Sequence, residues 1–391
     1  MLSIQPANRL SEVKEYYFSQ KLKEISLLNA EGKDIISLGI GSPDLPPTKE
    51  VINTLCEEAK NEMNHGYQPY SGIPELRKEF AHWYKQWYDV ELNETTEIQP
   101  LIGSKEGILH ITLAFVNPGE KVLVPNPGYP TYTSLSKILG AEVLPYDLKE
   151  ENGWMPDFES IEKTDLSNVK LMWVNYPNMP TGTNATKELF EKLVSFAKQH
   201  NIIVVNDNPY SFILNEEPLS ILSIDGAKDC CIELNSMSKS HNMPGWRVGM
   251  AAANPTFISW ILKVKSNIDS GMFKPLQLAA AEALKVDQQW YHINNENYKQ
   301  RRLLATQILD ELGCSFNDKQ VGLFVWGKIP DIYSNVEVLT DKVLNEARVF
   351  VTPGFIFGSN GARYIRLSLC CSEEKLKIAL ERIKEMNKNT N

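Results

Sequence analysis

The chain lacks the residue patterns that mark several classes of protein. Its 391 residues include six cysteines, and no pair has a C-x-x-C spacing. A disulfide framework and a cysteine metal site are therefore poor interpretations, and we expect reduced thiols and no metal. No run approaches the ~18 apolar residues that a membrane span needs. The first residues also lack the apolar core of a signal peptide, so we expect a cytoplasmic protein without a membrane partner.

Positive charge is also scarce. Lysine and arginine number 40 against 49 aspartates and glutamates, which gives a net charge of -9 at pH 7. An acidic chain is a poor match for nucleic acid, so we expect no nucleic-acid partner. What the sequence does have is length and 42% apolar residues. These are enough to bury a large core and to form two domains.

The middle of the chain alternates short apolar segments with amphipathic ones. We expect strands at 121–124, 141–145, 170–174, 202–205 and 231–234, and helices at 104–116, 130–138 and 186–199. Short, almost entirely apolar strands between helices are typical of a mostly parallel sheet that is covered on both faces. This pattern predicts an α/β fold.

The sequence pattern predicts a smaller α+β unit that is formed by the two ends of the chain. Outside the alternating middle part we expect strands at 35–41, 323–326 and 364–369. The helices that we expect there lie at 8–31, 48–62, 255–285, 286–312, 336–347 and 373–388. The charged helix at 286–312 is the expected connector. The predicted division is a large domain at 48–290 and a small domain formed by 1–47 and 291–391.

Lys239 lies in the most informative segment. Ser236 and Ser238 precede it, and Arg247 follows it. A lysine amine can form an imine with an aldehyde, while two hydroxyls and a guanidinium can hold a phosphate beside it. The alternative is an exposed lysine in a polar loop, so the interpretation depends on the rest of the chain.

Other segments would complete a phosphate and ring site. Gly103-Ser104-Lys105 follows a strand-like stretch and opens a helix, where backbone N–H groups favour phosphate. Asp207 ends the strand 202–205, at the edge where α/β sheets bind ligands, and Tyr210 follows it. Taken alone, the first segment is a weak signal, and an ordinary turn is the favoured interpretation of the second.

Two further segments offer neutral and cationic contacts. The loop after strand 170–174 carries Asn175 and Asn178 between prolines, and amides can hydrogen-bond a ring oxygen. Arg366 lies inside the strand 364–369, where a guanidinium can bind a carboxylate through two hydrogen bonds. A proline-rich turn and an arginine that faces water are the simpler alternatives.

Taken together and in this order, the segments resemble one family. With the stretches 38–44, 67–77 and 127–130, the chain resembles the class I/II, fold-type I aminotransferases that depend on pyridoxal 5'-phosphate (PLP), over nearly its whole length. The resemblance implies a large domain with a mostly parallel, seven-stranded sheet between helices, and a smaller α+β domain. It also implies transfer of an amino group from an amino acid to a 2-oxo acid.

The resemblance assigns roles to individual residues. Lys239 would carry PLP as an internal aldimine and move a proton, with Asp207 on the ring nitrogen and Tyr210 on the ring oxygen O3'. Tyr129 would stack on the ring. The phosphate would be held by Gly103, Ser104, Lys105, Ser236, Ser238 and Arg247, and by Tyr67 from the other subunit of a homodimer. Arg366 would bind the substrate carboxylate, with Ile40 and Gly41 closing over it.

One position departs from the family pattern. Relatives usually have Asn-Pro-Thr-Gly, in which the asparagine bonds O3', whereas this chain has Met179 in its place. A thioether cannot donate that hydrogen bond, so Asn178 or Asn175 is the expected substitute. The rival functions are a PLP-dependent C–S β-lyase or a related lyase on the same fold, and a non-catalytic PLP-binding regulator.

The substrate is less well defined by the sequence. The segment 265–275 resembles the branch around alanine, aspartate and diaminopimelate aminotransferases. A set of aromatic residues either lines the substrate pocket or packs in the core: Tyr16, Tyr17, Phe18, Tyr70, Phe355 and Phe357.

Overall fold

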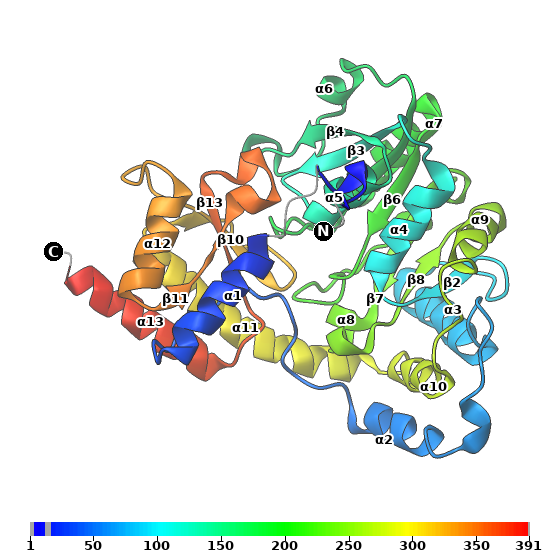
Figure 1. The fold of residues 1–391 in the computed structure, drawn as a ribbon, viewed down its shortest axis with the longest axis horizontal. Helices are drawn as coiled ribbons and strands as arrows, with labels where there is room; N and C mark the ends of the chain where they lie inside the picture. Colours follow the sequence, from blue (N-terminus) through cyan, green and yellow to red (C-terminus); the bar gives the residue numbers. More distant parts are fainter. Residues whose placement is uncertain (1–3, 12–16, 390–391) are drawn as a thin grey trace.

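A computed structural model describes residues 4–11 and 17–389 of the chain. Figure 1 shows a large sheet with its helices on the right and a smaller group of elements on the left. The long helix α11 (Gln288–Glu311) links them. Its first half packs Tyr291 into the large core, and its second half packs Ile308 and Leu309 into the smaller one. This helix is the connector that the sequence predicts.

The large sheet has seven strands within the described residues, in the order β2-β8-β7-β6-β5-β3-β4. Only β8 runs against its neighbours in this sheet, so the mostly parallel sheet is confirmed. The strands are β2 (Ile98–Leu101), β3 (Lys121–Asn126), β4 (Glu142–Asp147), β5 (Val169–Val174), β6 (Ile203–Asp207), β7 (Cys231–Ser236) and β8 (Gly249–Ala252).

Both faces of this sheet are buried because its strands are apolar on both sides. Leu171 and Trp173 pack on one face and Met172 and Val174 on the other. The first face is covered by α4 (Ser104–Phe115), α5 (Pro130–Ile138) and α9 (Pro255–Lys265), and the second by α3 (Pro74–Tyr88), α7 (Lys187–His200) and α10 (Lys274–Ala283). Further helices of this part are α2 (Lys49–Glu58), α6 (Phe158–Glu162) and α8 (Met237–Ser240).

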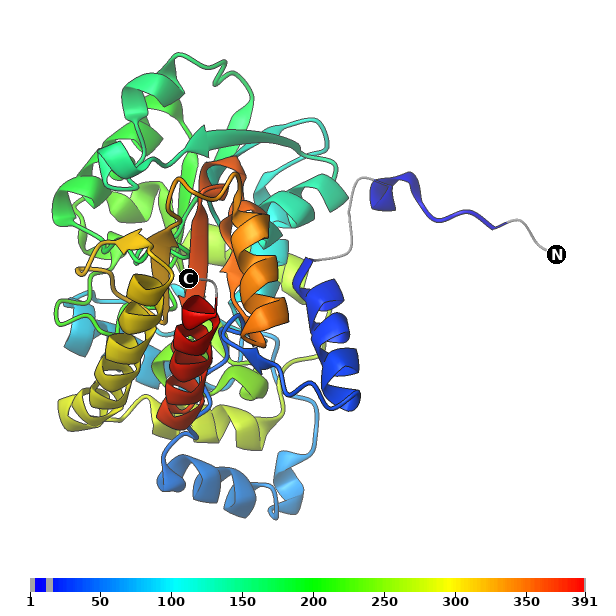
Figure 2. The same ribbon diagram turned by 90° about the vertical axis from the view of Figure 1, so that its left-hand side faces the viewer.

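The smaller unit combines segments from both ends of the chain. A four-stranded antiparallel sheet has the order β12-β13-β10-β9, and β1 pairs in parallel with β11 beside it. The strands are β1 (Ile36–Ser37), β9 (Ser315–Phe316), β10 (Phe324–Lys328), β11 (Val349–Phe350), β12 (Thr352–Pro353) and β13 (Tyr364–Ser368). Figure 2 shows the helices α1 (Tyr17–Ala30), α12 (Val336–Glu346) and α13 (Glu373–Lys388) side by side. The domain limits at 47/48 and 290/291 stay a prediction.

Some expected elements differ in the structure. The expected helix 255–285 is two helices, α9 and α10, because Gly271 adopts a φ of +84° and Pro275 opens the second helix. The expected helix 8–31 is observed as α1, with a 3-10 turn at Asn8–Leu10, and 12–16 lie outside the described residues. The expected strand 35–41 shortens to β1, and the expected helix 48–62 ends at Glu58. None of the described helices could span a bilayer.

Candidate active site

The predicted polar residues meet at one edge of the large sheet. Asp207 ends β6, Asn175 follows β5 and Ser236 ends β7. Ser104 follows β2, at the start of α4. Carboxyl ends of parallel strands share one edge, which is where α/β sheets bind ligands. Arg247 reaches the same edge because the antiparallel β8 begins there.

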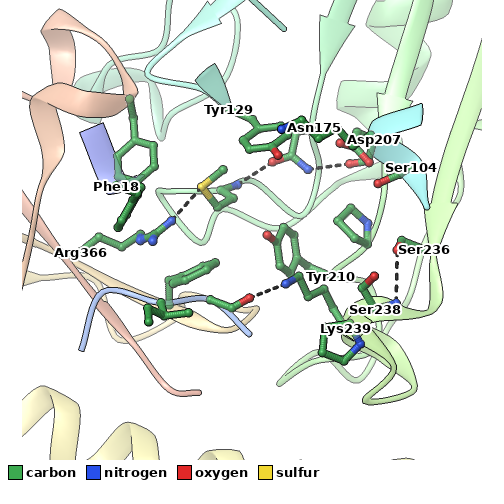
Figure 3. A pocket seen from close by; sticks show the side chains of 18 of the residues that line it. Phe18, Ser104, Tyr129, Asn175, Asp207, Tyr210, Ser236, Ser238, Lys239 and Arg366 are labelled. Carbon is green, nitrogen blue, oxygen red and sulfur yellow. Dashed lines mark hydrogen bonds between the residues drawn. The ribbon is translucent and has the colours of Figure 1, made fainter. Parts of the chain in front are cut away.

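A cavity of about 350 Å³ opens at this edge (Figure 3), within the range of small-molecule sites. The smaller unit and α1 form its other wall. It is lined by Phe18, Leu22, Gly39, Ile40, Gly41, Ser104, Lys105, Tyr129, Tyr132, Asn175, Met179, Asp207, Pro209, Tyr210, Ser236, Ser238, Lys239, Pro244, Arg247, Phe324, Phe357 and Arg366. Most of the residues predicted from the sequence are therefore neighbours in space.

Lys239 places its amine inside this cavity. It lies at the end of the short helix α8, and its Nζ donates a hydrogen bond to the carbonyl oxygen of Gly41 in the N-terminal segment. Burial lowers the pKa of Lys239, and the charges of Arg366 and Arg247 lower it further. A lysine with a lowered pKa has more of its amine in the neutral, nucleophilic form.

Asp207 has one oxygen that is bound and one that is not. Tyr132 donates its hydroxyl to Oδ2 at 2.8 Å, while Oδ1 has no hydrogen-bond partner among the described residues. The side chain is buried, and burial raises the pKa of Asp207 to about 6 against the effect of the Tyr132 hydrogen bond. A buried, unpaired carboxylate oxygen is costly, which marks a place for a donor from a ligand.

Hydroxyls and cationic groups gather on the other side of Lys239. Arg247 donates from Nη1 to the hydroxyl of Ser238 at 3.3 Å, and Ser236 caps α8 by accepting the N–H of Ser238. Gly103, with a φ of +78°, lies against Arg247: a Cβ there would come within 2.2 Å of Nη2. Glycine is therefore required for the guanidinium to reach the start of α4.

Arg366 forms the opposite end of the cavity. It is 4% exposed, and its Nη2 donates to the carbonyl oxygen of Gly39 at 2.8 Å. Its guanidinium carbon lies 3.8 Å from the ring centre of Phe324 and 4.6 Å from that of Phe357. The aromatic rings hold the guanidinium in place by cation–π contact, which suits it to bind a carboxylate.

The loop after β5 is fixed by amide hydrogen bonds. Asn175 donates from Nδ2 to the backbone oxygen of Asp207 at 2.6 Å and accepts the N–H of Met179 at 2.8 Å. The sulfur of Met179 meets Arg366 Nη1 at 3.2 Å. Asn178 bonds within the loop, to the oxygen of Asn175 and to Thr181. Of the two predicted substitutes, only Asn175 borders the cavity.

Like Asn178, two other site residues predicted from the sequence do not line the cavity. Gly103 lies behind the wall against Arg247. Tyr67 is 93% exposed and does not reach this cavity in its own chain. Of the aromatic set, Phe18 and Phe357 line the cavity, whereas Tyr17, Tyr70 and Phe355 do not, and Tyr16 lies outside the described residues.

Some residues that line the cavity were not predicted from the sequence. Tyr132 carries a signal only in its spacing from Tyr129, one turn along α5. Leu22 and Phe324 carry none, since they approach only through the packing of the smaller unit.

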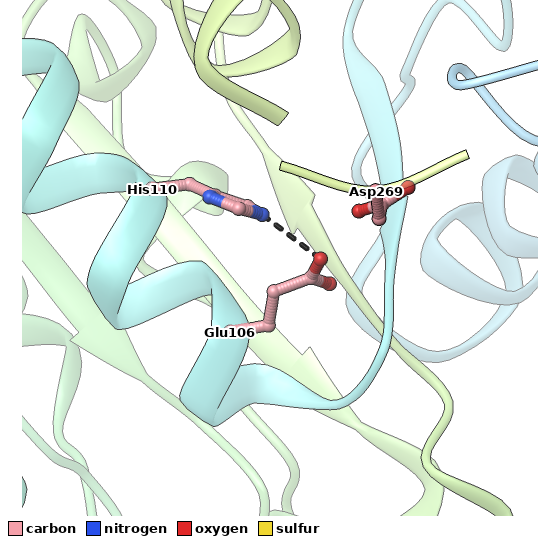
Figure 4. A group of neighbouring side chains, drawn as sticks. All are labelled: Glu106, His110 and Asp269. Atoms are coloured by element: carbon pink, nitrogen blue, oxygen red, sulfur yellow. Dashed lines mark hydrogen bonds and ion pairs between the residues drawn. The ribbon is translucent and has the colours of Figure 1, made fainter. Parts of the chain in front are cut away.

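Two partly buried carboxylates and a buried histidine meet at α4 (Figure 4). Glu106, His110 and Asp269 bring their ligand-type atoms within 4.8 Å of one another, which resembles a metal site. Lys265, however, places its ammonium 3.0 Å from Glu106 and 2.5 Å from Asp269. This ammonium supplies the positive charge that the two carboxylates need. The cluster joins α4 to the segment between α9 and α10.

The comparisons with known proteins agree with this geometry. The family model "Aminotransferase class I and II" matches residues 33–383. The chain belongs to this family. An LL-diaminopimelate aminotransferase from Maridesulfovibrio salexigens is 42% identical over 97% of this chain and 98% of its own.

Two solved structures share the fold of this aminotransferase. The substrate-bound BacF structure from Bacillus subtilis has a TM-score of 0.92 and 36% identity, over 99% of this chain and 98% of that one. An aromatic aminotransferase from Pyrococcus horikoshii has a TM-score of 0.88 and 30% identity, over 98% of this chain and 99% of that one. The aminotransferase fold and function expected from the sequence are thus confirmed.

Proposed function

We propose that this aminotransferase binds PLP through Lys239 and transfers an amino group from an amino acid to a 2-oxo acid. The observation that carries the proposal is the unpaired Asp207 Oδ1, which is buried in the same cavity as the Lys239 amine. A protonated pyridine nitrogen would give this oxygen the donor that it lacks. The donor set of the cavity therefore fits the cofactor.

The remaining residues fit the other parts of PLP. Ser104, Ser236, Ser238 and Arg247, with the N–H groups at the start of α4, would hold the phosphate. Tyr129 and Tyr210 would contact the ring and O3'. When bound, the cofactor supplies an electron sink for the charge released at the substrate Cα. With Met179 in place of asparagine, Tyr210 is the main side-chain donor that we expect at O3'.

The chain's own groups would bind and orient the substrate. Arg366 would hold the α-carboxylate, because its guanidinium is buried and braced by aromatic rings. Lys239, whose pKa burial lowers, would accept the proton from Cα as a neutral amine and return it at the cofactor. Ile40, Gly41 and α1 would cover the site and exclude water.

LL-diaminopimelate is the amino donor that we propose first. Support comes from full-length relatives of that name at about 40% identity, such as the protein from Dehalococcoides mccartyi. A screen of single-turnover reactions would test it: LL-diaminopimelate should convert the bound cofactor to its amine form faster than any other amino acid. Conversion of other amino acids at equal or higher rates would contradict this choice of substrate.

A large apolar amino acid is the second candidate. Phe18 and Leu22 of α1, together with Phe357, form an apolar wall next to Arg366. Such a wall favours a side chain without a distal charge. Phenylalanine should then outcompete LL-diaminopimelate in the same screen, and Phe18→Ala should lose that preference.

We also propose a homodimer with shared sites. The ring of Tyr67 is 93% exposed, and the exposed Phe273 contacts His65 near it at 5.5 Å between ring centroids. Exposed aromatic rings in one region are typical of a protein interface. Light scattering should give twice the mass of the 44.3 kDa chain. Tyr67→Phe should weaken PLP affinity without changing the oligomeric state.

Substitution of Lys239 tests the main proposal. Lys239→Ala should abolish turnover, and borohydride should no longer fix the cofactor to the protein. In the wild type, borohydride should attach it to the peptide that contains Lys239. Lys263→Ala, at an exposed position, is the control and should behave like the wild type. Normal turnover in Lys239→Ala would disprove the proposal.

A separate assay tests the rival C–S lyase. If the wild type forms pyruvate and ammonia from cystathionine without an oxo acid, the enzyme is a lyase instead.

A further inference from the structure

Tyr132 is buried beside Asp207 and has no role in the function proposed so far. It lies in α5, is 1% exposed and donates its hydroxyl to Asp207 Oδ2 at 2.8 Å. Its ring stacks on Trp173 in β5, with centroids 5.0 Å apart and planes at 4°. Its edge meets Tyr129, which also lines the cavity, at a centroid distance of 5.5 Å.

This packing directs the Tyr132 hydroxyl toward Asp207. The flat stack on Trp173 holds the ring in the core on one face of the sheet. Burial raises the pKa of Tyr132 well above its usual range, so the hydroxyl keeps its proton and remains a donor. Asp207 Oδ2 therefore has a neutral hydroxyl donor as its partner.

A donor on one oxygen changes what the other oxygen can do. With Oδ2 held, the carboxylate cannot rotate freely, and Oδ1 remains in the cavity without a partner. The Tyr132 hydrogen bond also favours the charged form of Asp207, because it is made to the carboxylate. Burial alone would favour the neutral acid, which donates a proton rather than accepting one.

We propose that Tyr132 is a positioning residue that fixes the orientation of Asp207 and keeps it anionic, so that the proton shared with a pyridine ring stays on the ring nitrogen. The inference rests on the proposed PLP site and deepens it. Tyr132 would act only through Asp207, because its hydroxyl donates its hydrogen bond to Oδ2.

The experiment compares two buried tyrosines in the holoenzyme. Tyr132→Phe removes the hydroxyl but keeps the ring and its stack on Trp173. Tyr146→Phe is the matched control: Tyr146 is 3% exposed and donates to the backbone oxygen of the same Trp173 at 2.8 Å, outside the cavity lining. Both variants lose one buried hydrogen bond, so a purely structural effect should be similar in the two.

The decisive measurement is the ¹⁵N NMR shift of the ring nitrogen in protein loaded with ¹⁵N-labelled PLP. In Tyr132→Phe the resonance should move toward that of an unprotonated pyridine, and in Tyr146→Phe it should stay at the wild-type position. Loss of a hydrogen bond to a charged group should also weaken PLP affinity roughly 10- to 100-fold in Tyr132→Phe. Equal resonances in the wild type and both variants would overturn the inference.

A second variant tests the same inference if Tyr132→Phe folds poorly. Fluorotyrosine at position 132 keeps the shape of the ring but is a stronger donor, and it should move the resonance in the opposite direction. An unmoved resonance would count against the inference. The two proposals fail separately: a wild type that does not bind PLP disproves the proposed function, whereas a PLP-bound wild type with an unresponsive Tyr132 disproves only this one.

Discussion

Two buried carboxylates on neighbouring strands, Asp207 on β6 and Glu233 on β7, have opposite hydrogen-bond environments. Burial raises the pKa of both. Glu233 accepts four hydrogen bonds: from Tyr84 at 3.0 Å, Ser220 at 2.8 Å, the N–H of Ile221 at 3.0 Å and Asn206 at 3.2 Å. Asp207 accepts one on its side chain, from Tyr132, and its other oxygen has no hydrogen-bond partner among the described residues.

The difference separates a carboxylate that the protein itself satisfies from one that we propose binds the cofactor. Glu233 is satisfied by neutral donors from several elements and needs nothing further. Its partner Asn206 also holds the N–H of Tyr176 at 3.0 Å, so Glu233 supports the loop that carries Asn175 and Met179. Asp207 keeps an unpaired oxygen at a place where the edge of the sheet meets a cavity. The incomplete hydrogen-bond set of Asp207, more than its burial, is the reason that we propose it as the ligand-binding carboxylate.

The largest expected effect is on activity. Asp207→Asn should lower kcat roughly 100- to 1,000-fold, because a neutral amide gives less stabilisation to the cationic ring as charge develops. Steady-state kinetics with saturating PLP would measure it. The matched variant Glu233→Gln should keep kcat within about threefold of the wild type for the folded fraction. Similar losses of kcat in both variants would remove the distinction.

Asp207 should also destabilise the protein that lacks PLP as the pH rises. Its pKa is near 3.8 when unfolded and about 6 when folded, so the folded state favours the protonated acid. Stability from this group is therefore greatest below pH 4 and is lost as the pH rises to about 6, at most about 3 kcal/mol. In urea unfolding at pH 7.5, Asp207→Asn should be more stable than the wild type without PLP. A difference of the same size at pH 4 would contradict this origin.

A third carboxylate, Glu106, extends the comparison of Asp207 with Glu233, because its partner is the cation Lys265. Burial would raise the pKa of Glu106, but the hydrogen bonds from His110 and from the N–H of Ile102 and the charge of Lys265 lower it to about 2. Lys265→Met should cost about 2–3 kcal/mol of unfolding free energy at pH 7, since it leaves two partly buried carboxylates facing each other. The loss should shrink as the pH falls from 4.5 toward 2. A loss that does not depend on pH would indicate a packing defect instead.

Glu233→Gln should have the smallest effect, on stability alone. The amide nitrogen of glutamine would face a donor, so one buried polar group would be left unpaired. This should lower the free energy of unfolding by about 2 kcal/mol. Because the folded pKa of Glu233 is raised, the wild type should lose stability as the pH rises above about 4.5, while the variant should not. Thermal unfolding across this pH range would show whether the two curves converge.

The sequence predicts this site well where chemistry and strand ends coincide. Lys239, Asp207 and Arg247 stand in recognisable local contexts, and the alternation of strands and helices places them at one edge. Tyr132 and Glu233 could not be assigned in this way, because their partners are far away in the sequence. Phe18 and Leu22 join the cavity only when α1 packs on the smaller unit. The break between α9 and α10 depends on Gly271, which lies where its missing Cβ avoids the oxygen of Gln68.

The pairing of β1 with β11 has a consequence for how the enzyme is made. Ile36 lies opposite Val349, and Arg366 holds the carbonyl of Gly39. On the ribosome, the N-terminal segment must therefore wait for almost the entire chain before its partners emerge. The large sheet can form first, since all of its strands precede residue 253. A nascent chain can thus hold Lys239, Asp207 and Arg247 in place before the strand that carries Arg366 has formed. Activity should therefore appear only after the chain has left the ribosome.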